Sequence, residues 1–477
     1  MRTFYGTGTS QTEMNELNSG NFRIGLARQS GTSLFDANGN ILQSHNYAVD
    51  TFLVLQSIKR HTDNEFFFVG GYAKDSCSML GDLLIRQTYP LIGRMDSLGN
   101  ILDAHNYLLN ATNCSNTAGD LEVLSDGGVI AWGIRVDRFY LLRVSNSGEP
   151  AWGRHFGAGG VFKFVKELPG GDLLAGFDLV NGGAAVARFD SEGNVLWSKS
   201  YIRPRGMITD AVILSDDSYL VTGITDSLTA DLFTPLPASY QPKLFLMNLN
   251  GAGEVQWCRG YDSMPNHWHA GSGSKIVNTL DGNLAVVATL GDPDYNWFFR
   301  PVLMKLDLNG DTLWTRSVGR QGYDYYAKDL LATSDGGYLY NDRVWGDLPG
   351  QLNFAFLYKA DAEGHLPCQE HHYPITIVDL FPVDSAVTLT STDGAVARPA
   401  FINETSYPPI IPYNGCDLTV VNMPPAIVRG RPVKVRPNPN TGRFTVQFAD
   451  PLMAESYYSV YDEIGRASCR EKVYSNV

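Results

Sequence analysis

The sequence lacks any apolar stretch of about 18 residues, so nothing in it predicts a helix that crosses a membrane. It also lacks basic runs, since 37 Lys and Arg stand against 50 Asp and Glu and the formal net charge is −13. This balance argues against nucleic acid or an anionic membrane as a partner. No long segment has a 3.6-residue apolar period, so little helix is expected.

The signatures of common active sites are missing as well. We find no nucleophile elbow, phosphate-binding loop, zinc-protease helix or dinucleotide-binding glycine motif, so we assign no catalytic residue and predict no cofactor. His267 and His269 lie near Asp262 in the sequence. Two loop histidines without a clear third ligand are a weak metal signal, and we predict no metal site.

What the sequence does contain is a repeat. The pattern Asp-x-x-Gly, with Trp four residues after the Gly, is clearest at Asp190 to Trp197 and at Asp307 to Trp314. Its copies lie 60, 49, 45, 60, 57 and 54 residues apart, and their glycines are Gly39, Gly99, Gly148, Gly193, Gly253, Gly310 and Gly364. Periods of this size are typical of stacked supersecondary units.

A second motif precedes each copy: an apolar run, Asp-Gly or an equivalent, and another apolar run, as around Asp126 and Asp335. Short apolar runs around Asp-Gly are typical of β-hairpins, because Gly adopts positive φ at little cost. Two hairpins per repeat give four strands. Seven repeats therefore predict an all-β fold, a seven-bladed β-propeller over residues 1–372.

The repeated turns invite two chemical interpretations, and neither fits. Segments such as Asp307 to Asp311 resemble calcium loops but lack the terminal Glu, and hairpin chemistry explains them. Quinoprotein propellers also carry an Asp, Gly, Trp motif, but with one more residue between Asp and Trp and a Thr before the Gly. We expect the tryptophans here to pack between blades, on the outer strands (Trp152, Trp197, Trp257 and Trp314).

Propeller geometry places the two tight turns of every blade on one face, so the long connections share the other face. Loops on a rigid scaffold commonly carry binding function. The richest candidates are aromatic and polar residues that could form a platform for a glycan or peptide: Trp268, Tyr295, Trp297, Phe298, Arg300, Tyr323 and Tyr325. The alternative is that these aromatics only pack loops against one another.

The composition changes after the last repeat. Residues 373–430 are rich in Pro, Thr and Ser and predict an extended connector, with a hairpin near Gly394. A strand pattern then follows a Pro-Asn-Pro turn, and Tyr458-Ser-Val-Tyr-Asp462 comes after a short gap. The turn and the strand after it include Pro437, Asn438, Pro439, Gly442 and Phe444.

This motif resembles the C-terminal sorting domain of type IX secretion substrates of Bacteroidota. The resemblance covers about thirty residues and implies a β-sandwich read by the outer-membrane translocon, with the cargo then released or tethered at the cell surface. Residues 431–462 would form a partial sorting domain. The family's further strands and basic end are missing, and residues 463–477 resemble the translation of a sequencing adapter, so we expect them not to be native protein.

The start of the chain carries no signal-peptide h-region. Arg2 to Gly6 resembles the end of a blade, as at Trp197 to Tyr201, so we expect it to supply the outer strand of the last blade. Such closure removes exposed edges.

Of the six cysteines, one lies in the adapter-like segment. Two pairs could form disulfides, Cys77 with Cys114 and Cys368 with Cys416, which would suit an oxidising compartment. Cys258 is expected to be a small buried hydrophobe.

Together these features predict a secreted or cell-surface binding or adhesion module, at the outer-membrane surface or outside the cell, exported by the type IX translocon. Its ligand would be an extracellular glycan or protein bound by the long-loop face. Two alternatives stay open: a hydrolase or lyase with its site in the axial channel, and a structural surface spacer. We favour a role that is not enzymatic.

Overall fold

The protein is described by a computed structural model that consists of β-strands and turns. It describes residues 2–5, 11–26, 31–48, 52–80, 83–109, 116–135, 138–157, 160–179, 183–201, 205–214, 217–226, 243–262, 270–292, 295–319, 324–345, 354–366, 370–400, 402–406, 413–414, 433–436, 445–448, 456–461 and 467–473, in places by backbone alone. In that part of the chain no helix is long and apolar enough to cross a membrane. The chain divides into two compact units, Met1–Pro412 and Tyr413–Val477.

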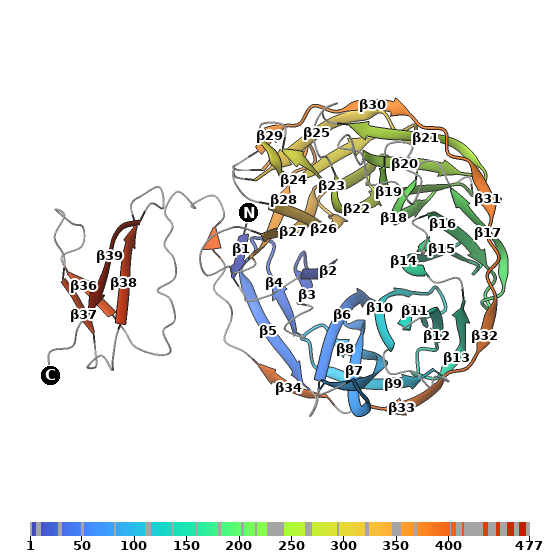
Figure 1. Ribbon diagram of the computed structural model, residues 1–477, viewed down its shortest axis with the longest axis horizontal. Helices are drawn as coiled ribbons and strands as arrows, with labels where there is room; N and C mark the ends of the chain where they lie inside the picture. The colour runs from blue at the N-terminus through green and yellow to red at the C-terminus, as the bar shows by residue number, and fades with distance from the viewer. Residues whose placement is uncertain are drawn as a thin grey trace. The chain divides into compact units, whose positions relative to one another are not determined.

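The first unit is a seven-bladed β-propeller, as predicted (Figure 1). Each blade is an antiparallel sheet whose first strand lies innermost, and the innermost strands of neighbouring blades contact one another around the ring.

The strands of the first four blades follow one another along the chain. They are β2 (Gln11–Glu16), β3 (Phe22–Leu26), β4 (Gly31–Phe35) and β5 (Ile41–Ala48); β6 (Phe52–Arg60), β7 (Glu65–Leu80), β8 (Leu83–Asp96) and β9 (Ile101–Leu108); β10 (Asn116–Val123), β11 (Val129–Arg135), β12 (Arg138–Val144) and β13 (Pro150–Phe156); β14 (Gly160–Glu167), β15 (Leu173–Leu179), β16 (Ala184–Phe189) and β17 (Val195–Tyr201).

The last three blades continue this order. They are β18 (Arg205–Ile213), β19 (Tyr219–Asp226), β20 (Lys243–Leu249) and β21 (Val255–Asp262); β22 (Ala270–Asn278), β23 (Leu284–Asp292), β24 (Tyr295–Leu306) and β25 (Thr312–Val318); and β26 (Asp324–Ala332), β27 (Tyr338–Trp345) and β28 (Phe354–Ala360).

The repeated turns have the predicted chemistry. In the fourth blade the Asp190 carboxylate accepts the backbone N–H groups of Glu192 and Asn194, at 3.0 and 2.8 Å. Gly193 has φ 79°, a conformation that costs a residue with a Cβ more than it costs Gly. The strand register shifts between Arg188 and Phe189, which is the expected bulge.

The ring is closed by the N-terminal segment, as the sequence predicted. Strand β1 (Arg2–Tyr5) pairs antiparallel with β28, with Arg2 opposite Leu357 and Tyr5 opposite Phe354. The seventh blade thus takes its fourth strand from the start of the chain, which satisfies an edge that β28 would otherwise expose.

The segment after the seventh blade differs from the connector that was expected. It runs backwards around the rim and adds a fifth strand to six blades, one after another (Figure 1). We call residues 370–406 the belt. Its strands lie on the outer strands of blades six to one in that order: β29 (Glu370–His372), β30 (Thr376–Asp379), β31 (Asp384–Ala386), β32 (Ser391–Asp393), β33 (Val396–Pro399) and β34 (Asn403–Ser406).

The hairpin predicted near Gly394 is wrong. Strand β32 pairs with β13 and strand β33 pairs with β9, so the two belt strands lie on different blades. Turn residues alone suggested a local pairing, whereas open edges on the outer strands offered partners far away in the sequence.

The core lies between blades. Between the third and fourth blades, the side chains of Phe139, Phe162 and Phe177 are fully or almost fully buried, and the rings of Phe139 and Phe162 meet edge to face at 4.5 Å. Equivalent clusters join blades one and two, two and three, four and five, five and six, and seven and one. Each blade therefore buries its two faces against its neighbours, and a single blade has no core of its own.

The second unit contains five short strands. They are β35 (Tyr413–Asn414), the antiparallel pair β36 (Val433–Arg436) and β37 (Thr445–Phe448), and the antiparallel pair β38 (Ser456–Tyr461) and β39 (Ala467–Val473). The sorting-motif residues Pro437, Asn438, Pro439, Gly442 and Phe444 lie outside the described residues.

Candidate functional site

The predicted aromatic platform is only partly within the described chain. Trp268 and Tyr323 lie outside it, and Tyr295, Trp297 and Phe298 belong to β24, of which the backbone is described there. Arg300 and Tyr325 are buried, with 5% and 2% of their surfaces exposed. These two side chains lie in the packing between strands.

The segment from Gly291 to Arg300, expected to be an irregular loop, is instead a continuation of the β23–β24 hairpin. Asp292 pairs with Tyr295 and Gly291 with Phe299, with a bulge between them. The Phe299 ring lies 5.9 Å from the Tyr326 ring of the next blade. The backbone of Tyr295, Trp297 and Phe298 therefore belongs to a β-hairpin whose register is interrupted between Phe299 and Tyr295.

Cys258 is 3% exposed, as predicted, and its burial raises the pKa of the thiol to about 12. Cys114, Cys368 and Cys416 lie outside the described residues, and Cys77 is described only by its backbone in β7. The two disulfides stay predictions.

The innermost strands carry charged residues that sequence reasoning missed. Each strand leads into a tight turn, and four residues before that turn the seven blades carry Glu13, Ser57, Asp120, Phe164, Asp210, Lys275 and Asp329. The second and fourth blades have no charge at this position, but Lys59 lies two residues after Ser57 and Lys166 two residues after Phe164, on the same side of their strands. Every blade thus contributes at least one charge, and the third also carries Glu122 two positions after Asp120.

We call these seven charged residues the axial ring: Glu13, Lys59, Asp120, Lys166, Asp210, Lys275 and Asp329. Carboxylates on the odd-numbered blades alternate with lysines on the even-numbered ones. Because seven is odd, two carboxylates must be neighbours. They are Asp329 of the seventh blade and Glu13 of the first, at the junction where the ring closes.

Glu13 is the best-defined member of the axial ring. Its carboxylate lies 2.5 Å from Lys59 Nζ and accepts the Ser57 hydroxyl at 2.8 Å, and Glu13 is 8% exposed. Burial, the Asp120 charge and the Asp329 charge raise the pKa of Glu13 to about 8, against the opposing charges of Lys59 and Lys275. Burial also raises the pKa of Asp329.

On the opposite side of the axis the charges are balanced. Burial would raise the pKa of Asp210, but the charges of Lys275 and Lys166 and two backbone N–H groups lower it. Burial would lower the pKa of Lys275, but surrounding carboxylates, Asp210 first, raise it. The like-charged pair at the closing junction is therefore where the axial ring holds a proton most readily.

The axial ring also joins the blades. A bulge interrupts each innermost strand and frees backbone N–H groups, which neighbouring blades satisfy. Asp329 accepts the N–H of Met14 at 2.8 Å, and Asp210 accepts that of Ile276 at 3.2 Å. These carboxylates consequently have a structural role whatever chemistry they also perform.

A second buried carboxyl lies in the seventh blade. Asp342 on β27 is 1% exposed and accepts the Tyr358 hydroxyl at 2.6 Å, while its Oδ1 atom has no hydrogen-bond partner among the described residues. Burial raises the pKa of Asp342 to about 8. Asn341 beside it accepts the backbone N–H of Asp329 at 3.1 Å, which connects this strand to the axial ring.

The face with the tight turns is occupied by contacts between blades. In several blades a tyrosine lies eight residues after the turn glycine, and its hydroxyl donates to the carbonyl of the next blade's turn glycine. Tyr201 donates to Gly253 O at 2.9 Å, and Tyr261 donates to Gly310 O at 2.7 Å. Trp197 Nε1 donates to Gly251 O at 3.1 Å.

The repeat tryptophans explain why the turn residue is Gly. A Cβ on Gly364 would clash with the Trp314 ring of the preceding blade. The predicted packing of Trp152, Trp197, Trp257 and Trp314 between blades is confirmed by their contacts with the next turn. The Asp-x-x-Gly turn of one blade and the Trp of the preceding blade thus form one contact between the two blades.

A shallow cavity of about 490 Å³ lies on this face, where the seventh blade meets the first. Ala37 and His365 are among its lining residues, and its Lys359 lies 2.7 Å from Asp335. Because these two charges neutralise each other, the cavity offers a ligand little unpaired charge.

The architecture defines the class of this protein: it is a seven-bladed β-propeller with a belt around its rim. The sequence matches no protein-family model and no curated protein.

Several solved structures share the propeller fold. One is virginiamycin B lyase from Staphylococcus aureus with Quinupristin, with a TM-score of 0.44 and 12% identity over 74% of this chain and 98% of that chain. NanB sialidase from Streptococcus pneumoniae gives 0.39 and 10%, over 74% and 70%. Drosophila Plexin A in complex with Semaphorin 1b gives 0.38 and 8%, over 74% and 86%. At these identities the likeness concerns the fold alone.

Proposed function

We propose that this protein is a secreted or cell-surface binding module that presents its ligand site on the face opposite the tight turns. The observation that supports this proposal is the use of the turn face. There the tyrosine hydroxyls, the tryptophan rings and the turn carboxylates make contacts within and between blades, for example at Tyr201, Trp197 and Asp190. That face is scaffold.

The strand order places the longer connections on the other face. Residues 227–242 link β19 to β20, and residues 263–269, which include Trp268, link β21 to β22. The β23–β24 hairpin extends in the same direction and carries Trp297. Loops and ribbons held by a rigid ring are a common setting for ligand recognition. We propose a glycan or an extracellular peptide as the ligand.

The binding test uses the full chain on glycan and peptide arrays. The variants Trp268→Ala and Trp297→Ala are expected to lose at least tenfold in affinity for any ligand found, since aromatic anchors commonly contribute this much. Leu313→Ala is the matched control, because Leu313 is 53% exposed at the start of β25, near the tight turns. Unchanged affinity in both tryptophan variants would remove the platform, and no ligand on any array would favour a structural spacer.

We further propose that residues 431–462 are part of a sorting domain for the type IX translocon and that the native protein acts outside the cell or on the outer-membrane surface. The sorting-motif sequence supports this proposal. With a signal peptide added and residues 463–477 replaced by the remaining strands of a type IX sorting domain, a variant with Pro437, Asn438 and Pro439 replaced by Ala should stay inside a type IX-competent host, whereas Asp335→Asn in the propeller should not affect export. Equal secretion of both variants would contradict the proposal.

The axial ring favours one alternative, an enzyme with its site in the channel. Glu13 has a pKa of about 8 and lies beside Lys59, which suits a general acid. If this alternative holds, Glu13→Gln should abolish turnover of a substrate that Trp268→Ala still processes. If the carboxylate only joins blades, the same variant should alter stability and leave ligand affinity intact.

A further inference from the structure

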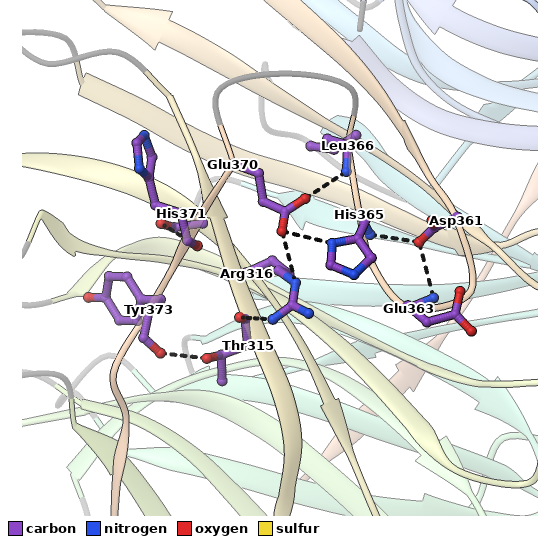
Figure 2. Close-up of polar contacts among 10 residues, drawn as sticks. Thr315, Arg316, Asp361, Glu363, His365, Leu366, Glu370, His371 and Tyr373 are labelled. Atoms are coloured by element: carbon purple, nitrogen blue, oxygen red, sulfur yellow. Dashed lines mark hydrogen bonds and ion pairs between the residues drawn. The ribbon is translucent and has the colours of Figure 1, made fainter.

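The belt is anchored firmly at its start. The Glu370 carboxylate accepts the Leu366 N–H at 2.8 Å and contacts His365 Nδ1 and Arg316 Nε, both at 3.0 Å (Figure 2). Tyr373 is fully buried and its hydroxyl donates to Gly291 O at 2.6 Å. Burial and multiple hydrogen bonds make this anchor the most stable part of the belt.

Beyond the anchor the contacts are few and exposed. All three residues of β31 and all three of β32 are exposed. One or two apolar side chains of the belt, such as Leu380 and Leu389, lie against a core between blades and are only partly buried. A strand of three exposed residues with one apolar contact has low local stability.

Opposite charges guide the belt onto the blades. The outer strand of each of blades three to six carries a cation six residues after its turn glycine, and the belt places a carboxylate near each one. The pairs are Arg316 with Glu370, Arg259 with Asp379 at 4.0 Å, Lys199 with Asp384 at 3.3 Å, and Arg154 with Asp393. The three pairs beyond the anchor have exposed carboxylates, and pairs of this kind are weak and sensitive to salt.

The belt contributes little to the cores between blades. Belt strands pair with only the second half of each outer strand, as β31 pairs with Lys199, Ser200 and Tyr201 of β17. The cores between blades are built mainly from the blades' own strands. Removal of the belt therefore exposes strand edges but leaves each core largely intact.

We propose that the belt is a releasable strap: it undocks from blades five to one while Glu370 and Tyr373 hold it to blade six. The released belt, residues 374–406, would span up to roughly 110 Å at about 3.3 Å per residue. Release of the strap would thus lengthen the chain segment between the propeller and the second unit. This use of the strap rests on the proposed function, since reach benefits a binding module held at a surface.

The test is native-state hydrogen exchange of the full chain, followed by mass spectrometry at low and high salt. Peptides within residues 376–399 should exchange at least tenfold faster than peptides from β15 and β16, and faster still at high salt. The triple variant Asp379→Asn, Asp384→Asn and Asp393→Asn should raise belt exchange roughly three- to thirtyfold further, as expected for the loss of three exposed ion pairs.

Asp126→Asn is the matched control, because Asp126 pairs with Arg143 on the turn face at 2.7 Å and has no part in the belt. It should leave belt exchange unchanged. The proposal is contradicted if belt and blade amides exchange at the same rate at both salt concentrations, because the belt would then open only when the whole ring unfolds. A failed ligand search would not change these rates, so the two proposals can fail separately.

Discussion

The buried carboxyl of Asp342 gives a sharp test of the structure. Its pKa is about 8 in the folded protein, against about 3.9 for an unfolded Asp. Between these values the folded protein binds one more proton than the unfolded chain, so the free energy of unfolding falls as pH rises. The slope is about 1.4 kcal/mol per pH unit, and the loss reaches roughly 5 kcal/mol near pH 8.

Asp342→Asn removes this dependence, because the amide oxygen can still accept the Tyr358 hydroxyl but cannot ionise. The variant should differ little from the parent near pH 4.5 and become progressively more stable than it up to pH 8. The assay is urea unfolding followed by tryptophan fluorescence at pH 5, 6, 7 and 8. Glu13 titrates in the same direction in both proteins, so the difference between them isolates Asp342.

Asp335→Asn is the control in the same blade. The pKa of Asp335 is about 2: partial burial would raise it, but Lys359, Thr333 and the Gly337 N–H lower it. This carboxylate is ionised in both states above pH 5, so its variant should differ from the parent by a constant amount. A flat difference for Asp342→Asn over the same range would refute the buried, protonated carboxyl.

Three further predictions concern the ring. Tyr201→Phe should lower the free energy of unfolding by about 1 kcal/mol through loss of its bond to Gly253, as measured by urea denaturation. Trp197→Ala should cost about 2 kcal/mol or more by thermal denaturation, since a half-buried ring and its bond to Gly251 are both lost. Replacing both Thr3 and Phe4 by Pro removes a backbone N–H that faces β28, because one of two successive residues in a strand points its N–H to that side. The double variant should lower the free energy of unfolding by about 3 kcal/mol and promote association through the exposed edge. Thr3→Ala should be nearly neutral. An equal, small effect of all these changes would mean that the blades are not held together as described.

The fold could be predicted from the sequence because its determinants are local. The Asp-x-x-Gly turn needs a backbone conformation that Gly supplies and an Asp side chain that closes it, and both lie within four residues. Counting these turns gave the number of blades. The pairing of Arg2 to Tyr5 with β28 was also predictable, because the segment resembles the end of a blade and the last blade lacked one.

The belt and the axial ring could not be predicted in the same way. A belt strand such as β32 pairs with β13, more than 200 residues earlier in the chain, and its exposed polar residues give no apolar alternation. The axial charges differ from blade to blade, so no repeated letter marks their position. A signal did exist, since each lies four or two residues before a turn that the sequence had already located.

The central claim is that the turn face is scaffold and the opposite face binds. The most direct test measures ligand affinity and thermal midpoint on the same samples of Trp197→Ala and Trp268→Ala. The account predicts that Trp197→Ala lowers the midpoint and leaves the affinity of the folded protein unchanged, and that Trp268→Ala lowers the affinity and leaves the midpoint unchanged. The reverse result, with affinity lost in Trp197→Ala alone, would contradict it.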